Sequence, residues 1–171
     1  MATRQNRKTT GLIGVIVPRF QDLFFASLLD SIEKAARVAG YTIITQSSHG
    51  EKDYEEQAVN KLRSMNVDGA IIAPLGIEGN FEAFKSAVSD FPIIFADSRP
   101  SQPLPNSDFV GTDNEKSIGL IVEYLCRSGK APIFLAMPNL NTNAIERKEA
   151  YFEKMRELGI QPEVVDAPKG N

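Results

Sequence analysis

The stretch Gly11-Leu-Ile-Gly-Val-Ile-Val17 runs into Pro18-Arg-Phe-Gln-Asp-Leu-Phe-Phe25, and this junction decides the fold. An apolar run of strand length comes first, and a helical pattern of apolar residues begins at Phe24. A nucleotide-binding unit would need glycines at the turn, so that the backbone could approach a pyrophosphate. The junction instead offers Gln21, Asp22 and two aromatic rings. These groups suit a small hydroxylated molecule, at the place where an open α/β sheet binds its ligand.

Strand and helix patterns alternate along the rest of the chain. Apolar runs predict strands over residues 12–17, 41–46, 69–74, 92–96, 109–111, 132–137 and 163–166. Helical spacing predicts helices over residues 24–39, 53–65, 81–88, 114–127 and 143–158. Such alternation implies parallel strands with right-handed crossovers, and therefore an α/β, doubly wound parallel sheet. The first five strands complete one sheet, and the last two only begin a second.

These patterns predict three parts of the chain. Residues 1–10 carry three basic residues and no acidic one, which indicates either a basic linker or a solvated tail. Residues 11–129 form one lobe, which ends at a break near Lys130. Residues 130–171 form the start of a second, similar lobe that is incomplete in this chain.

Composition narrows the function classes. The net charge of −3 gives no general basic field, so the body of the chain is not an obvious nucleic-acid binder. The single cysteine, Cys126, excludes an internal disulfide framework and favours a reducing compartment. No apolar run reaches membrane-spanning length, and the N-terminus lacks the apolar core of a secretory signal, so a cytoplasmic protein without membrane contact is expected.

No pattern of catalytic or cofactor chemistry is found. A phosphate loop, a nucleophile elbow and a Ser/His/acid set are all missing, so an enzyme is disfavoured and no catalytic residue or cofactor is expected. His49 is the only histidine, and no cluster with metal-ligand spacing surrounds it. We interpret His49 as a loop residue and expect no metal site.

Short motifs in one consistent order carry a resemblance to a known family. They are Ile13-Gly-Val-Ile-Val-Pro18, Phe24-Phe25, Ala39-Gly-Tyr41, Val67-Asp-Gly-Ala-Ile-Ile72, Pro92-Ile-Ile-Phe-Ala-Asp97, Val110-Gly-Thr-Asp-Asn114, Glu146-Arg147 with Glu149, and Leu158-Gly-Ile160. From Thr10 onward the chain resembles the effector-binding domain of the lactose-repressor (LacI) family of transcriptional regulators, and the related periplasmic sugar-binding proteins. The resemblance implies a periplasmic-binding-protein-like fold, in which two lobes close on a sugar-like or purine-like effector.

The resemblance also implies which residues contact the effector. In the first lobe the ligand-binding candidates are Gln21, Asp22, Phe24, Phe25 and Asp97. Their positions agree with the rule that ligands bind at the carboxyl ends of parallel strands. Alternatives stay open, because Asp97 is also suited to a turn, and we expect one phenylalanine to be core and the other to line the site. Asp113 is more typical of a helix cap than of a ligand contact.

The chain departs from the family pattern at three places. The usual Asn-Pro before the two phenylalanines is Asp22-Leu23, and the usual Asp-Arg after the fourth strand is Asp97-Ser98. In the second lobe the family commonly has Arg-Glu-Arg, and the first arginine reaches the ligand. The matching residues here are Ile145-Glu146-Arg147, so a hydrocarbon replaces that cation. Ile145 is therefore the second-lobe candidate, and the resemblance alone does not identify the effector.

The function that the resemblance implies is effector sensing in a LacI-type transcriptional regulator. The effector would be a small molecule of carbohydrate type, and such regulators resemble two-fold dimers that match palindromic operators. Operator DNA would be bound only through a DNA-binding headpiece, which is absent from this chain. The alternative is a periplasmic sugar-binding protein of a transporter. The basic residues before Thr10 favour the regulator, in which a linker joins the headpiece to this domain.

Overall fold

The computed structural model describes residues 9–76, 80–137 and 141–168, which form two sheets and their flanking helices. Strands of the first sheet are β1 (Leu12–Val17), β2 (Thr42–Ser47), β3 (Gly69–Ile72), β4 (Ile93–Ala96) and β5 (Ser107–Val110). Those of the second sheet are β6 (Ile133–Ala136) and β7 (Glu163–Asp166). The helices are α1 (Leu23–Val38), α2 (Lys52–Ser64), α3 (Phe81–Ala87), α4 (Asn114–Cys126) and α5 (Thr142–Glu157).

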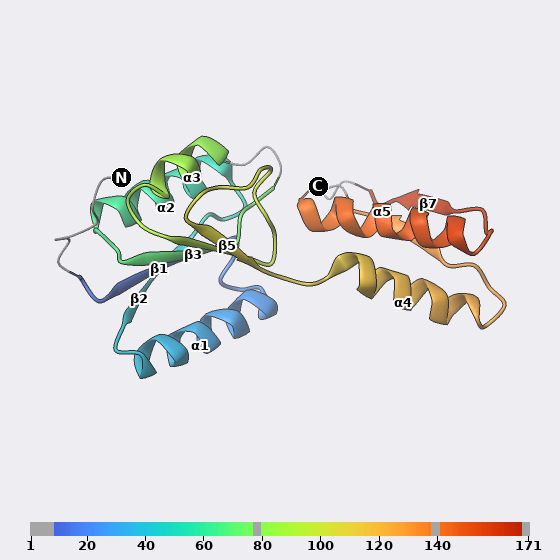
Figure 1. Ribbon diagram of the computed structural model, residues 1–171, viewed down its shortest axis with the longest axis horizontal. Helices are drawn as coiled ribbons and strands as arrows, with labels where there is room; N and C mark the ends of the chain where they lie inside the picture. The colour runs from blue at the N-terminus through green and yellow to red at the C-terminus, as the bar shows by residue number, and fades with distance from the viewer. Residues whose placement is uncertain (1–8, 77–79, 138–140, 169–171) are drawn as a thin grey trace.

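The first sheet is parallel throughout and has the order β2-β1-β3-β4-β5. Because β1 lies between β2 and β3, the chain winds away from β1 in both directions and helices cover both faces. Figure 1 shows α1 on one face of this sheet and α2 and α3 on the other. The predicted α/β class and order of elements are confirmed. The strand predicted over residues 109–111 lies slightly earlier, since Ser107 already pairs with Ile93.

The core of the first unit lies between the sheet and the two helices α2 and α3. Its fully buried members include Ile16, Leu62, Ile72, Phe84, Ile93 and Phe95. A Cβ at position 14 would overlap the Leu62 side chain, which explains the glycine inside this apolar strand. Close packing of α2 on β1 therefore depends on Gly14.

The helices start slightly differently from the sequence prediction. The helix predicted over residues 53–65 begins at Lys52, so Asp53 lies in its first turn. The N-cap position is Glu51, which makes no side-chain cap bond. Asp53 still suits this place because a carboxylate near a helix N-terminus interacts favourably with the helix dipole. Across the part of the chain that the structure describes, no helix has the length and apolar character needed to cross a membrane.

The second unit is built from α4, α5, β6 and β7. Its buried hydrophobic cluster consists of Val122, Tyr151 and Met155. The Tyr151 hydroxyl donates to the carbonyl oxygen of Pro132 at 2.8 Å and accepts from the backbone N–H of Glu163 at 3.0 Å. One side chain thus ties together the segments that lead into β6 and β7.

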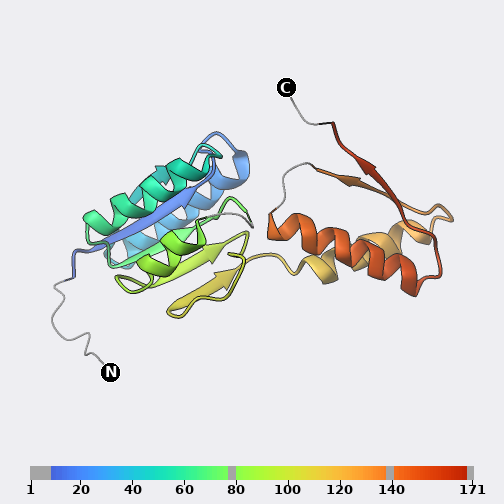
Figure 2. The same ribbon diagram turned by 90° about the horizontal axis from the view of Figure 1, so that it is seen from above.

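The packing of α4 bears on the division of the chain. We expected α4 to belong to the first lobe, with a break near Lys130. In the structure α4 packs along α5, and Figure 1 and Figure 2 show both helices beside each other, apart from the five-stranded sheet. We propose that the boundary lies in residues 111–113, between β5 and α4. An amphipathic helix at the end of a lobe looks the same in sequence whichever unit it covers.

Candidate functional site

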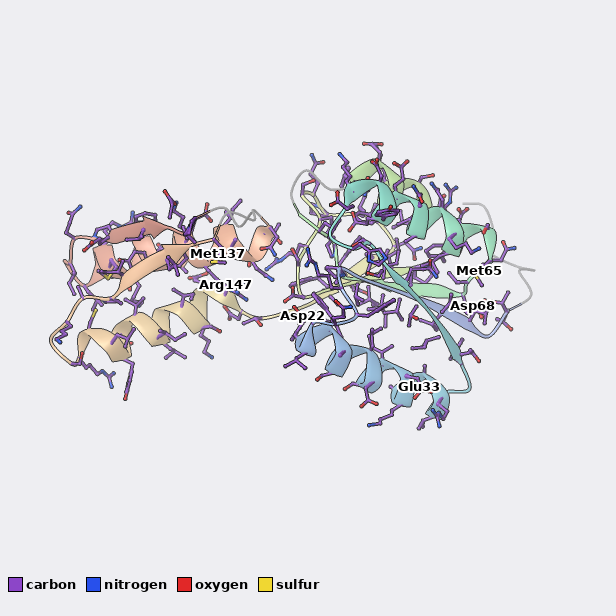
Figure 3. All side chains as sticks on the ribbon, turned by 180° about the vertical axis from the view of Figure 1, so that it is seen from behind. Asp22, Glu33, Met65, Asp68, Met137 and Arg147 are labelled. Carbon is purple, nitrogen blue, oxygen red and sulfur yellow. The ribbon has the colours of Figure 1, made fainter. Side chains whose placement is uncertain are left out.

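The carboxyl ends of β1 and β4 face the start of α5 at the junction of the two units. Asp22 follows β1, Asp97 follows β4, and Arg147 lies one turn into α5. Figure 3 shows Asp22 on the side of the first unit that faces Arg147. This edge is where a doubly wound sheet places its ligand, and the second unit supplies an opposite wall.

Asp97 is the central acidic group of this junction. Its backbone has a φ of 66°, in the left-handed region, and its N–H donates to the Val110 carbonyl at 2.9 Å. Burial raises the pKa of the Asp97 carboxyl above its ordinary value, while the Arg147 charge and a hydrogen bond from Asn143 lower it. The nearby Asp22 carboxylate raises this pKa further. Asp97 is thus a half-buried acid in a strained conformation, a combination that is common at functional sites.

Arg147 is held in place by a buried amide network that starts at Asn114. The Arg147 Nε–H donates to Asn114 Oδ1 at 2.8 Å, and Asn114 is only 3% exposed. The Asn114 amide nitrogen donates to Asn143 Oδ1 at 2.9 Å and to Glu146 Oε2 at 2.7 Å. One asparagine at the start of α4 therefore orients three polar side chains of α5 toward the junction.

Polar contacts also join the end of β4 directly to α5. The hydroxyl oxygens of Ser98 and Thr142 lie 2.8 Å apart, and the Arg99 N–H donates to Thr142 Oγ1 at 2.9 Å. The Arg99 guanidinium lies over the Phe109 ring, 4.6 Å from its centre, and 3.4 Å from Glu146 Oε1. We name this group of residues 98, 99, 142 and 146 the junction contacts, because they connect the two units beside Asp97.

The residues predicted at the β1–α1 junction have distinct positions. Asp22 caps α1, because its Oδ1 accepts the Phe24 N–H at 2.9 Å. Gln21 is exposed, Phe24 is 55% exposed, and Phe25 is half-buried. The two rings meet edge to face with centres 5.1 Å apart. The expectation that one phenylalanine belongs to the core is wrong in this structure, since neither ring is fully buried. Their contact with a ligand stays a prediction.

Three further expectations concern Ile145, Asp113 and His49. Ile145 is half-buried on α5 and lies outside the buried cluster of the second unit, so its place as a ligand contact stays a prediction. Asp113 is the cap of α4, because its Oδ1 accepts the Lys116 N–H at 3.0 Å. His49 lies in a loop, and its ring meets Tyr54 edge to face beside an open hollow of about 580 Å³ between β2 and α2. Within the described ranges, no group of three or more metal-ligating side chains is found.

Sequence reasoning missed three groups at the junction: Arg147, Asn114 and Asn143. The first two were inside recognised motifs, yet a motif does not say which way a side chain points. The feature that would have pointed to them is Asn114, the buried first residue of α4. A buried amide nearly always has hydrogen-bond partners, and these partners are the polar side chains of α5. With Arg147 beside Asp97, the junction does contain a cation, although at a different position from the one replaced by Ile145.

Comparison with known proteins gives the family. A family model described as periplasmic binding proteins and sugar binding domain of LacI family matches residues 10–168. The chain belongs to this family. The resemblance found in the sequence is therefore confirmed, and the matched region includes both units.

Among curated proteins, the sucrose operon repressor of Lactococcus lactis subsp. lactis is 25% identical over 163 residues, covering 94% of this chain and 49% of that protein. The ribose operon repressor of Halalkalibacterium halodurans is 26% identical, covering 94% of this chain and 46% of that protein. The chain spans about half the length of the curated relatives it matches.

Solved structures show the same fold. A periplasmic binding protein/LacI transcriptional regulator from Alkaliphilus metalliredigens, complexed with D-xylulofuranose, has a TM-score of 0.77 at 19% identity, covering 95% of this chain and 58% of that one. A LacI family regulator from Lactobacillus casei with bound glucose has a TM-score of 0.73 at 20% identity, covering 91% of this chain and 58% of that one.

Proposed function

We propose that this chain is the effector-sensing part of a LacI-type transcriptional regulator, and that its effector is a neutral carbohydrate bound at the junction of the two units. Family membership and the names of the curated relatives support the regulator class. The observation that carries the proposal is the half-buried Asp97 in a left-handed conformation at the end of β4, where the Arg147 charge and a hydrogen bond from Asn143, both on the opposite unit, lower the pKa of its carboxyl.

The chemistry of this pair favours hydroxylated ligands. An ionised carboxylate only accepts hydrogen bonds, and a guanidinium only donates them. A sugar hydroxyl does both, so a row of hydroxyl groups can bridge Asp97 and Arg147 without adding net charge. The exposed Phe24 ring offers an apolar surface on which the C–H face of a sugar ring stacks.

The remaining predicted residues extend this site. Gln21 and Asp22 would form its polar rim, Phe25 would support Phe24, and Ile145 would give the second unit an apolar patch beside Arg147. A hydrocarbon at position 145 leaves fewer charged donors for the ligand than two arginines would. We therefore expect a ligand with at least one apolar face and no phosphate group.

The wider setting follows from the same family. We expect operator DNA to be bound through a headpiece that is outside this chain, a homodimeric and cytoplasmic protein, and no enzymatic activity. A periplasmic sugar-binding protein remains the alternative, because the family description includes that class. The curated relatives quoted above are repressors, which favours the regulator.

Saturation-transfer NMR on this chain tests the ligand class. Ribose, glucose, xylulose and sucrose are compared with gluconate, a sugar phosphate and adenine. We expect transfer to at least one neutral sugar, and its loss in Asp97→Asn, because a hydrogen bond to a charged group contributes about 1.5–3 kcal/mol. Asp108→Asn, the same change at an exposed carboxylate on β5, is the control and should bind like the wild type. Preference for the anions, or unchanged binding in Asp97→Asn, would contradict the proposal.

A further inference from the structure

At the end of the first sheet remote from the candidate site, hydrogen bonds join the start of β1 to the turn that precedes β3. Both carboxylate oxygens of Asp68 accept backbone N–H groups, Oδ1 from Thr10 at 3.0 Å and Oδ2 from Gly11 at 2.7 Å. The Asp68 N–H donates to the Leu12 carbonyl at 2.8 Å. The Thr10 hydroxyl donates to the Asn66 carbonyl at 3.0 Å. Two segments more than fifty residues apart are therefore joined by side-chain and backbone contacts.

The backbone at this point is shaped to receive a carboxylate. Gly11 has a φ of 71°, which turns two successive N–H groups toward the same side. Such a concave arrangement of amides binds anionic groups. A side chain at position 11 would strain the backbone, because this conformation favours glycine. The Gly11 carbonyl also accepts the Thr42 N–H at 2.8 Å, so the same residue anchors β1 to β2.

A turn-forming role does not account for Asp68. An aspartate that serves its own turn bonds backbone groups two residues along the chain. Both oxygens of Asp68 instead accept from residues 57 and 58 positions away. The left-handed conformation of Asn66, with a φ of 53°, forms the turn and directs its carbonyl to Thr10.

We propose that Asp68 and Asn66 form a clip that holds residues 10–12 and sets the point from which the preceding basic segment leaves the first unit. Asp68 is a positioning residue in this clip. Figure 3 places Asp68, with Met65, at the end of the first unit remote from Asp22. The attachment point and the candidate ligand site thus lie at opposite ends of the strands of one sheet. The inference extends the proposed function, in which this segment would join the sensing unit to a DNA-binding headpiece.

Amide hydrogen exchange in this chain tests the clip without sugar or DNA. Asp68→Ala removes both acceptor oxygens, and Asp68→Asn keeps one. We expect the Thr10 and Gly11 amides to exchange about tenfold faster or more in Asp68→Ala, and by a smaller factor in Asp68→Asn. The amide of the fully buried Val15, in the same strand, should be unchanged. Asp108→Asn is the matched control.

Trypsin gives an independent reading. Cleavage after Lys8 requires residues 9–11 to leave the clip and enter the protease, whereas cleavage after the exposed Lys130 does not. We expect Asp68→Ala to accelerate the first cut and leave the second unchanged. Should Asp68→Ala unfold the unit, Thr10→Val decides. It removes the hydroxyl that donates to Asn66 and accepts the Leu12 N–H at 3.4 Å, leaves both Asp68 oxygens in place, and should still accelerate the Lys8 cut.

Unchanged Thr10 and Gly11 exchange in folded Asp68→Ala, or an unchanged Lys8 cut in Thr10→Val, would overturn the clip. Both results would leave the sugar site untouched, because neither readout depends on a ligand. Conversely, a failure of sugar binding would not change either measurement.

Discussion

The two units of the molecule differ in how they bury their apolar residues. The first unit has helices on both faces of a five-stranded sheet and an extended buried core. The second has Val122, Tyr151 and Met155 as its buried cluster, and Ile133 and Leu135 on β6 are more than half exposed. A unit with few buried contacts opens at lower free energy. The first unit is therefore the rigid platform of the site, and the second is its more easily displaced wall.

The largest expected effect comes from the core of the first unit. Phe95 is fully buried, and its ring meets Phe84 edge to face with centres 5.4 Å apart. Phe95→Ala should lower the free energy of unfolding by about 3–5 kcal/mol. Denaturant unfolding measures this, and hydrogen exchange locates it. Faster exchange is expected in β1 and β3, with α5 unaffected. Equal acceleration in both units would mean that they unfold as one body.

A smaller effect is expected from the second unit. Tyr151→Phe keeps the ring and removes the hydroxyl that joins Pro132 and Glu163. Two hydrogen bonds are lost, each worth about 0.5–1.5 kcal/mol, so the change should cost about 1–3 kcal/mol in total. Exchange of the β6 and β7 amides should rise, with Tyr124→Phe, the same change at an exposed tyrosine on α4, as the control. No change in those amides would show that the hydroxyl does not tie the strands.

The junction contacts should respond more weakly still. Thr142→Val preserves shape but removes the hydroxyl shared with Ser98 and Arg99. Loss of these bonds should reduce the free energy that holds the two units together by about 0.5–1.5 kcal/mol. The distribution of distances between the units should therefore become broader. Spin labels on the native Cys126 and on an exposed first-unit position such as Ser89→Cys report that distance. Arg63→Gln, which breaks the Arg63–Asp90 pair within the first unit, is the control. An identical distance distribution in Thr142→Val would show that other contacts set the arrangement.

The smallest effect concerns pH. Burial raises the pKa of Glu55, although hydrogen bonds from Asn80 and the Leu75 N–H oppose this shift. A group with a raised folded-state pKa contributes stability that is complete below its unfolded pKa and lost as pH rises through the folded one. The wild type should therefore lose a small part of its stability as pH rises through the mildly acidic range. Glu55→Gln should abolish that part, as measured by urea unfolding at several pH values. Parallel profiles for both proteins would contradict this origin.

The fold was predictable because hydrophobic periodicity and turn residues are local. The β1–α1 junction and the alternation of strands and helices follow from patterns within about ten residues. The partner of α4 was not predictable, since periodicity identifies an apolar face and not the surface that covers it. Arg147 was missed for the same reason: its direction depends on Asn114, more than thirty residues away. Asp22 was recognised as polar, but its role as a cap needed the backbone of Phe24.

Chemical-shift mapping tests the central claim, that the sugar binds at the junction of a rigid unit and a displaceable one. The amides of the isotope-labelled chain are followed during titration with the sugar selected by saturation transfer, in the wild type and in Arg147→Gln. We predict shifts at residues 21–25, 97–99 and 142–147, and their loss or marked weakening in Arg147→Gln. Shifts that centre on the hollow beside His49 and Tyr54, or that persist unchanged in Arg147→Gln, would contradict the account.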